Sequence, residues 1–152
     1  MPLAPNALPE NFAAHLITTM PDAVVYADAD GLVRYWNAAA ERIFGFSEAE
    51  AIGQSLDLII PERLRDRHWA GYRETMRTGK SRYDSGQLLS VPATRKDGAR
   101  ISVEFTIVPF TGNDGRMVGI AAVMRDATAR FEEMRELRRS LAAHTGGTPK
   151  QP

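Results

Sequence analysis

The sequence predicts an α+β domain in which five antiparallel β-strands form one sheet, helices cover one face of the sheet, and a further helix flanks the domain at each end. Residues 23–27 and 32–36 are β-prone runs separated by a turn that contains Gly31, which is typical of a hairpin. Residues 100–107 alternate strictly between apolar and polar side chains, and a glycine-containing turn lies on either side of them. Short helical segments occupy the chain between these two groups of strands, which favours helices packed on a single sheet.

The chain begins with a proline-containing stretch, residues 1–9, which we expect to be a flexible lead. Phe12, Leu16 and Met20 recur every four residues and predict an amphipathic helix over residues 10–20, which Pro21 ends. The hairpin follows, and we expect it to open a single domain that spans residues 21–127.

Two short helices are predicted after the hairpin. Asn37 can cap a helix over residues 38–44, and Gly45 can end it in a left-handed conformation. Ser47 and Glu50 have the spacing of a capping box, which predicts a second helix start.

The longest helix of the predicted domain spans residues 61–79, from a proline suited to the first helical position to a glycine that ends it. Leu64, His68, Tyr72 and Met76 recur every four residues and therefore share one face, which we expect to point inward. This spacing makes His68 the candidate chemical centre. Trp69 lies about 100° round the helix from His68, where we expect it to pack at an edge or an interface.

Three strands are predicted to follow as a meander, near residues 88–94, 100–107 and 117–125, joined by turns at residues 96–98 and 112–115. In the middle strand, Ile101, Val103, Phe105 and Ile107 share the face that we expect to be buried. The opposite, polar face can be turned either to solvent or to a pocket, and the strand alone does not decide between them.

The last predicted helix spans residues 128–144. Its apolar seam contains Phe131, Met134, Leu137 or Arg138, and Leu141. The seam resembles a coiled coil but covers barely two heptads, so a dimeric coiled coil and a helix folded back on the domain are both open. Residues 145–152 are expected to form a disordered tail.

The composition narrows the possible functions. Nineteen basic and nineteen acidic residues give no net charge, so neither a nucleic acid nor an anionic membrane is expected as a partner. The absence of cysteine excludes disulfides, thiolate metal sites and a cysteine nucleophile. No signal-peptide pattern and no apolar run of roughly 20 residues is present, and we therefore expect a cytoplasmic protein. The carboxylates are scattered and no phosphate-binding loop occurs, so we do not expect an enzyme.

Residues 18–128 resemble the PAS family of sensory domains. The resemblance is carried by Asp30-Gly31, by YWNAAAERIFGF at residues 35–46, by EAIGQ at 50–54, by RKDG at 95–98 and by RDAT at 125–128. It implies the PAS fold, with strand order 2-1-5-4-3 and a ligand cleft between the sheet and the helices. It also implies a sensor that forms a homodimer and passes a signal through its C-terminal helix to a protein effector in trans.

Residues 60–68 resemble the haem-bearing helix of FixL-type oxygen-sensing PAS domains, through Ile-Pro-Glu followed by an arginine-rich turn and a histidine. The resemblance implies that His68 is the metal ligand of a b-type haem, with gas or redox sensing as the function. Arginines of this helix would pair with the propionates, the candidates being Arg63, Arg65, Arg67 and Arg73. The other candidate cofactor-binding residues are Leu64, Tyr72, Gln87, Leu88, Leu89, Val91, Ile107, Ile120, Ala122 and Met124.

Two questions stay open at this point. FixL-type sensors usually place an arginine on the strand opposite the iron, whereas residues 85–89 here read SGQLL. Gln87 can donate a hydrogen bond to bound oxygen, while a leucine would leave an apolar side suited to CO, NO or no diatomic ligand. Alternatively, His68 only lines a pocket, and the domain is a non-haem interaction or dimerisation module whose pocket is empty or holds a small metabolite.

Overall fold

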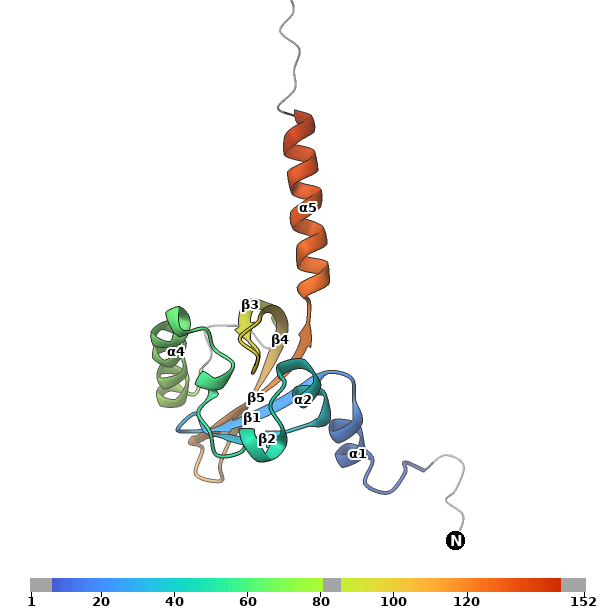
Figure 1. Ribbon diagram of the computed structural model, residues 1–152. Helices are drawn as coiled ribbons and strands as arrows, with labels where there is room; N and C mark the ends of the chain where they lie inside the picture. The colour runs from blue at the N-terminus through green and yellow to red at the C-terminus, as the bar shows by residue number, and fades with distance from the viewer. Residues whose placement is uncertain (1–6, 81–85, 146–152) are drawn as a thin grey trace, which may run out of the picture.

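Five antiparallel strands form one sheet in the order β2-β1-β5-β4-β3 (Figure 1), which confirms the expected fold class and strand order. The computed structural model describes residues 7–80 and 86–145, so most of the expected lead, nearly all of the expected tail and Ser85 lie outside the described residues. The strands are β1 (Ala23–Asp28), β2 (Val33–Trp36), β3 (Leu89–Thr94), β4 (Arg100–Thr111) and β5 (Met117–Asp126). The helices are α1 (Phe12–Thr19), α2 (Ala38–Phe44), α3 (Glu48–Ala51), η1 (Leu56–Leu58), η2 (Glu62–Leu64), α4 (Arg65–Thr78) and α5 (Thr128–Thr145).

The short helices begin and end where the local signals predict. The Asn37 side chain accepts a hydrogen bond from the backbone N–H of Ala40, and Gly45 ends α2 with φ 85°. Ser47 and Glu50 form a reciprocal capping box at the start of α3. The predicted helix over residues 61–79 divides instead into the 3₁₀ turn η2 and the helix α4, because the N–H of Leu64 bonds to the carbonyl of Pro61 with 3₁₀ spacing.

The sheet register shows which side chains face the helices. Val25 on β1 pairs with Ala122 on β5, Ala122 pairs with Ile107 on β4, and directly paired residues share a face. On this inner face the residues near α2, α3 and η1 form the buried core, in which Phe44, Val33 and Val103 are the largest fully buried side chains.

The polar face of β4 turns away from this core. Glu104 forms an ion pair with Arg130, and the backbone N–H of Ser102 donates to the hydroxyl of Thr128 at 3.0 Å. The alternative in which these polar residues line the inner side of the sheet is therefore not observed. They instead fasten the start of α5.

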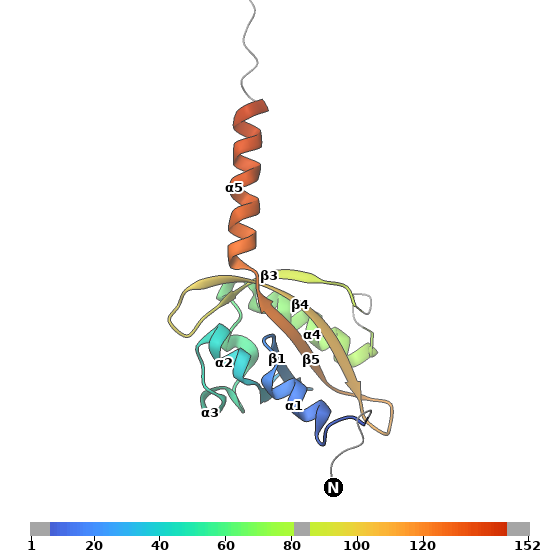
Figure 2. The same ribbon diagram turned by 90° about the vertical axis from the view of Figure 1, so that its right-hand side faces the viewer.

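Helix α5 projects away from the sheet (Figures 1 and 2), and none of its residues is buried. Phe131, Met134, Leu137 and Leu141 each keep about half or more of their surface exposed. The structure thus does not show the alternative in which this helix folds back on the domain.

Candidate functional site

Helix α4 contacts the end of β1 through a buried tyrosine. The Tyr72 hydroxyl donates to the carbonyl oxygen of Asp28 at 2.6 Å and lies 3.2 Å from that of Ala27. Burial, followed by the nearby Asp28 carboxylate, raises the pKa of Tyr72 above its ordinary value. The hydroxyl therefore stays protonated and acts as a fixed hydrogen-bond donor between α4 and the sheet.

Trp69 packs on the turn between β1 and β2. Its indole N–H donates to the Asp57 carboxylate at 2.7 Å, and its ring fills the space beside Gly31, where a Cβ would come within 2.2 Å of the ring. The sequence-based expectation of an edge position missed this role, since the contacts that bury Trp69 come from residues remote in the sequence. The sequence predicts a turn at Asp30-Gly31, but it does not indicate which side chain packs on that turn.

His68 precedes Trp69 on α4 and is half-buried. Its ring centroid is 4.6 Å from that of Trp69 in an edge-on arrangement and 5.8 Å from that of Tyr72. The Nδ1 atom is buried and has no hydrogen-bond partner among residues 7–80 and 86–145. Burial lowers the pKa of His68, and the negative charge of Asp57 partly opposes that shift. The ring is therefore neutral near pH 7, and a neutral imidazole is the form that ligates metals.

The structure brings most of the candidate wall residues to the same side of the sheet as α4. By register, the inner face carries Leu89, Val91, Ile107, Ile120, Ala122 and Met124. Val91 keeps 40% of its surface exposed, and Ile107 and Ile120 are half-buried. The inner face at this end of the sheet is apolar and less densely covered than the core under α2.

Gln87 and Leu88 are not brought to this wall. Both precede β3, which begins at Leu89, and both are exposed, Leu88 to 60%. The β3–β4 ladder begins with the pair Leu89 and Phe105, so no strand partner holds either residue against the sheet.

The arginines of the region differ in their contacts. Arg65 donates from Nε to the Ile60 carbonyl and from Nη2 to the Asp57 carbonyl, so it ties the first turn of α4 to the preceding loop. Arg63 lines an open hollow of about 610 Å³ together with Pro61, Glu62, Thr94, Gly98 and Arg100. Arg73 lines a smaller hollow of about 300 Å³ with Ala29, Asp30, Ser55, Trp69 and Tyr72. His68 lines neither hollow.

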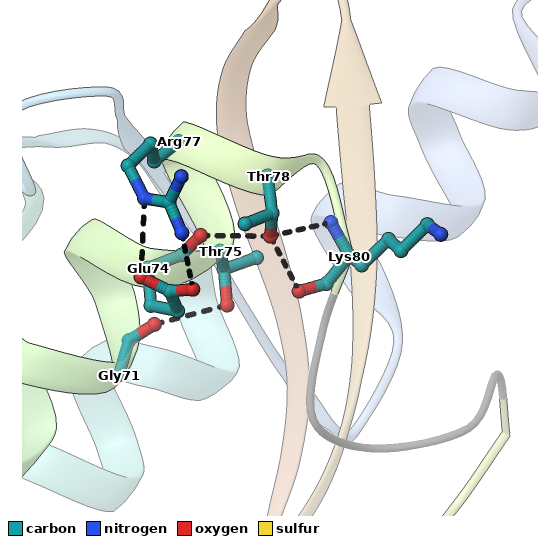
Figure 3. A network of polar contacts seen from close by, with 6 residues as sticks. All are labelled: Gly71, Glu74, Thr75, Arg77, Thr78 and Lys80. Atoms are coloured by element: carbon teal, nitrogen blue, oxygen red, sulfur yellow. Dashed lines mark hydrogen bonds and ion pairs between the residues drawn. The ribbon is translucent and has the colours of Figure 1, made fainter.

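A polar network closes the C-terminal end of α4 (Figure 3). Arg77 forms two hydrogen bonds with the Glu74 carboxylate, and the Thr75 hydroxyl donates to the Gly71 carbonyl at 3.0 Å. The Thr78 hydroxyl donates to the carbonyl of Glu74 at 2.8 Å, just before Gly79 ends the helix with φ 70°. These bonds satisfy groups at the helix terminus and keep the last turn formed.

Comparisons with known proteins agree with this architecture. A family model described as "PAS fold" matches residues 11–127. Sensor protein FixL of Bradyrhizobium diazoefficiens is 35% identical over 98 residues, which cover 64% of this chain and 19% of that protein. Oxygen sensor protein DosP of Escherichia coli is 30% identical over 140 residues, which cover 92% of this chain and 17% of that protein. The chain thus spans less than a fifth of the length of these relatives.

Solved structures show the same fold. The PAS domain of a protein from Colwellia psychrerythraea superposes with a TM-score of 0.67 at 24% identity, covering 77% of this chain and 95% of that one. An RNA-binding Light-Oxygen-Voltage receptor superposes with a TM-score of 0.68 at 20% identity, covering 97% of this chain and 43% of that one. Within residues 7–80 and 86–145, no helix has the length and apolar character needed to cross a membrane.

Proposed function

Because the chain belongs to the PAS fold family, with a family match over residues 11–127, we propose that this sensory domain binds a b-type haem through His68 and reports a diatomic gas or a redox change. Its relatives include a sensor protein and an oxygen sensor protein, which places the domain in signalling. The binding of haem, the nature of the signal and its transmission to an effector are what we propose for this chain.

The observation that carries the proposal is the state of His68. A buried imidazole nitrogen without a hydrogen-bond partner costs free energy, roughly 1–3 kcal/mol, unless a ligand or another group satisfies it. The lowered pKa keeps the ring neutral, so a lone pair is free for a metal. No cluster of three or more histidine, aspartate or glutamate side chains that could hold a metal ion occurs among the described residues.

A lone imidazole beside an apolar wall fits haem better than a bare metal ion. A bare ion needs several protein ligands, whereas haem supplies four nitrogens of its own and can be held by one axial histidine. Tyr72 lies on the same helix as His68 and Leu64 in the 3₁₀ turn just before it, whereas Ile107 and Ile120 lie on the inner face of the sheet. These side chains would supply the apolar contacts with a porphyrin. When bound, the haem would supply an iron that takes up a gas molecule or changes oxidation state.

A signal generated at His68 would reach an effector through the junction between β5 and α5. The Thr128 hydroxyl accepts from the backbone N–H of Ser102 and lies 2.5 Å from Asp126 Oδ1, to which it donates. The N–H of Ala127 donates to the Ser102 carbonyl at 2.8 Å. A displacement of β4 or β5 would therefore move the first turn of α5, and a protein effector in trans would read that movement.

We further propose that α5 pairs with α5 of a second copy. The exposed seam of Phe131, Met134, Leu137 and Leu141 lies on a helix that projects from its own domain and has no buried residue. Multi-angle light scattering tests this: Leu137→Glu should convert a dimer into a monomer. A wild-type protein that is monomeric at high concentration would refute the pairing.

Absorption spectroscopy of the full chain purified with haem available tests the haem proposal. Wild-type protein should show a Soret band, and His68→Ala should lose the band or shift it. His144→Ala is the matched control, because His144 lies exposed on α5 and should leave the spectrum unchanged. A wild type without a Soret band, or with a band that His68→Ala leaves intact, would refute haem ligation by His68.

The second candidate is a non-haem interaction domain with an empty or metabolite-filled pocket. It is favoured by one observation, namely that His68 lines neither of the two hollows described above. Native mass spectrometry of freshly purified protein separates the two candidates. A mass increment equal to haem supports the first, whereas an unliganded mass or a small organic molecule supports the second.

A further inference from the structure

The side-chain hydrogen bonds that tie helix α4 to the sheet and to the preceding loop lie along one edge of the helix. Apart from the bond of Thr78 to Lys80 just after the helix, the described side-chain bonds that leave α4 reach the loop before it and the end of β1: Arg65 to Ile60 and Asp57, Trp69 to Asp57, and Tyr72 to Asp28 and Ala27. Among the described residues, no hydrogen bond joins α4 to β3, β4 or β5. His68 lies about 100° round the helix from Trp69 and one turn before Tyr72, so it borders this fastened edge on its Tyr72 side.

The fastened edge has one contact that depends on a specific shape. Gly31 stands at φ 77° in the β1–β2 turn, and a Cβ there would lie 2.2 Å from two atoms of the Trp69 ring. The indole N–H is directed by its 2.7 Å bond to Asp57. A ring held by a backbone surface on one side and a hydrogen bond at its edge has little freedom to rotate, so the helix that bears it is fixed in angle.

We propose that Trp69, seated on Gly31 and bonded to Asp57, is the positioning residue that sets the angle at which α4 holds the His68 ring. The two residues are neighbours on α4 and their rings are in edge-on contact, so a displaced Trp69 ring displaces the His68 ring with it. The consequence for haem rests on the proposed function, whereas the effect on the His68 ring itself does not.

Gly31→Ala and Gly53→Ala form a matched pair that isolates the contact. Both glycines have a positive φ, 77° and 84°, so both substitutions carry the backbone strain of a left-handed residue. Only at Gly31 does the new methyl group meet the Trp69 ring, because nothing lies within 4 Å of a Cβ at Gly53. The difference between the two variants is therefore the effect of unseating Trp69.

The first readout is the NMR spectrum of the histidine rings in protein without haem. The chain has only three histidines, so the His68 resonances are identified by their loss in His68→Ala. We expect Gly31→Ala to shift them and Gly53→Ala to leave them in place. In a Trp69→Ala background, Gly31→Ala should cause no further shift. Equal shifts in the two glycine variants would overturn the proposal.

The second readout is haemin titration, in which Gly31→Ala should weaken binding roughly 10-fold, the lower end of the roughly 10–100-fold loss seen when a group that orients a metal ligand is removed. If Gly31→Ala fails to fold, Trp69→Phe takes its place, because it leaves the turn intact and removes the hydrogen bond to Asp57. Unchanged His68 resonances in Trp69→Phe would overturn the proposal. A wild type that binds no haemin refutes the haem proposal, and the NMR comparison still decides the role of Trp69.

Discussion

Replacing Tyr72 with phenylalanine tests whether α4 is fastened to β1 as the structure shows. The substitution removes one buried hydroxyl and leaves the ring in place. That hydroxyl donates to the Asp28 carbonyl at 2.6 Å, and the Ala27 carbonyl lies 3.2 Å away. Losing a buried hydrogen bond of this kind costs about 1–2 kcal/mol, because the Asp28 carbonyl then keeps only its bond from the N–H of Gly31. The melting temperature should fall by about 3–6 °C.

Tyr35→Phe is the matched control. The Tyr35 hydroxyl is also buried, but it has no hydrogen-bond partner in the part of the chain that the structure describes. Removing an unsatisfied buried hydroxyl relieves a desolvation cost, so this variant should be as stable as the wild type or slightly more stable. The same chemical change is thus expected to have opposite effects at the two positions.

Urea unfolding followed by far-UV circular dichroism measures both variants. Tryptophan fluorescence is a poor probe here, since the Trp69 ring centroid lies 5.3 Å from that of Tyr72 and would respond locally. Protein without haem should be used, because a bound ligand would add its own stabilisation. If Tyr72→Phe is no less stable than Tyr35→Phe, the hydroxyl does not fasten α4 to β1 and the single-edge attachment is wrong.

Three further outcomes are expected. Asn37→Ala should lower the free energy of unfolding by about 3 kcal/mol and speed hydrogen exchange in α1, because the buried amide bonds both the backbone of β1 and the Ile17 carbonyl. Hydrogen bonds from Lys96 and from the Ser47 backbone lower the pKa of Glu50 to about 2. The contribution of Glu50 to the stability of the fold is therefore present above about pH 4.5 and is lost as pH falls towards 2. Acid unfolding of Glu50→Gln should lack that part of the pH dependence. Burial lowers the pKa of His68 in the folded protein, so as pH falls the unfolded chain takes up a proton on His68 before the folded protein does. Haem-free wild type should therefore lose stability as pH falls below about 6.5. Urea titrations at several pH values should show a smaller loss in His68→Gln.

The strands and the helix caps could be predicted because their signals are local. The strict alternation of residues 100–107, the cap at Asn37 and the capping box at Ser47 each depend on residues within a few positions of one another, and each is found in the structure. The strand order was not available from spacing, since antiparallel pairing of β1 with β5 joins segments far apart in the chain. It followed only from the resemblance to a family.

The candidate site was predictable in part. The four-residue spacing indicated the inward stripe of α4, and Tyr72 is indeed its most buried member. The same reasoning placed Trp69 at an edge, because helix spacing shows which residues share a face but not what lies opposite them. The seat on Gly31 and the bond to Asp57 are tertiary contacts. The predicted strand near residues 88–94 makes Leu88 an apolar wall residue, whereas β3 begins one residue later, at Leu89.

The position of the buried core bears on how any result at His68 is interpreted. The fully buried side chains lie under α2, α3 and η1 and include Phe44, Val33 and Val103, whereas the inner face near α4 retains exposed apolar surface, as at Val91. Most of the hydrophobic stabilisation therefore comes from the core under these helices, of which His68 is not a member. A substitution at His68 should leave the fold intact, so a lost Soret band in His68→Ala would report the loss of an iron ligand rather than unfolding. Because the core and the region around His68 are separate, the side chains near His68 can be loosely packed without preventing the chain from folding.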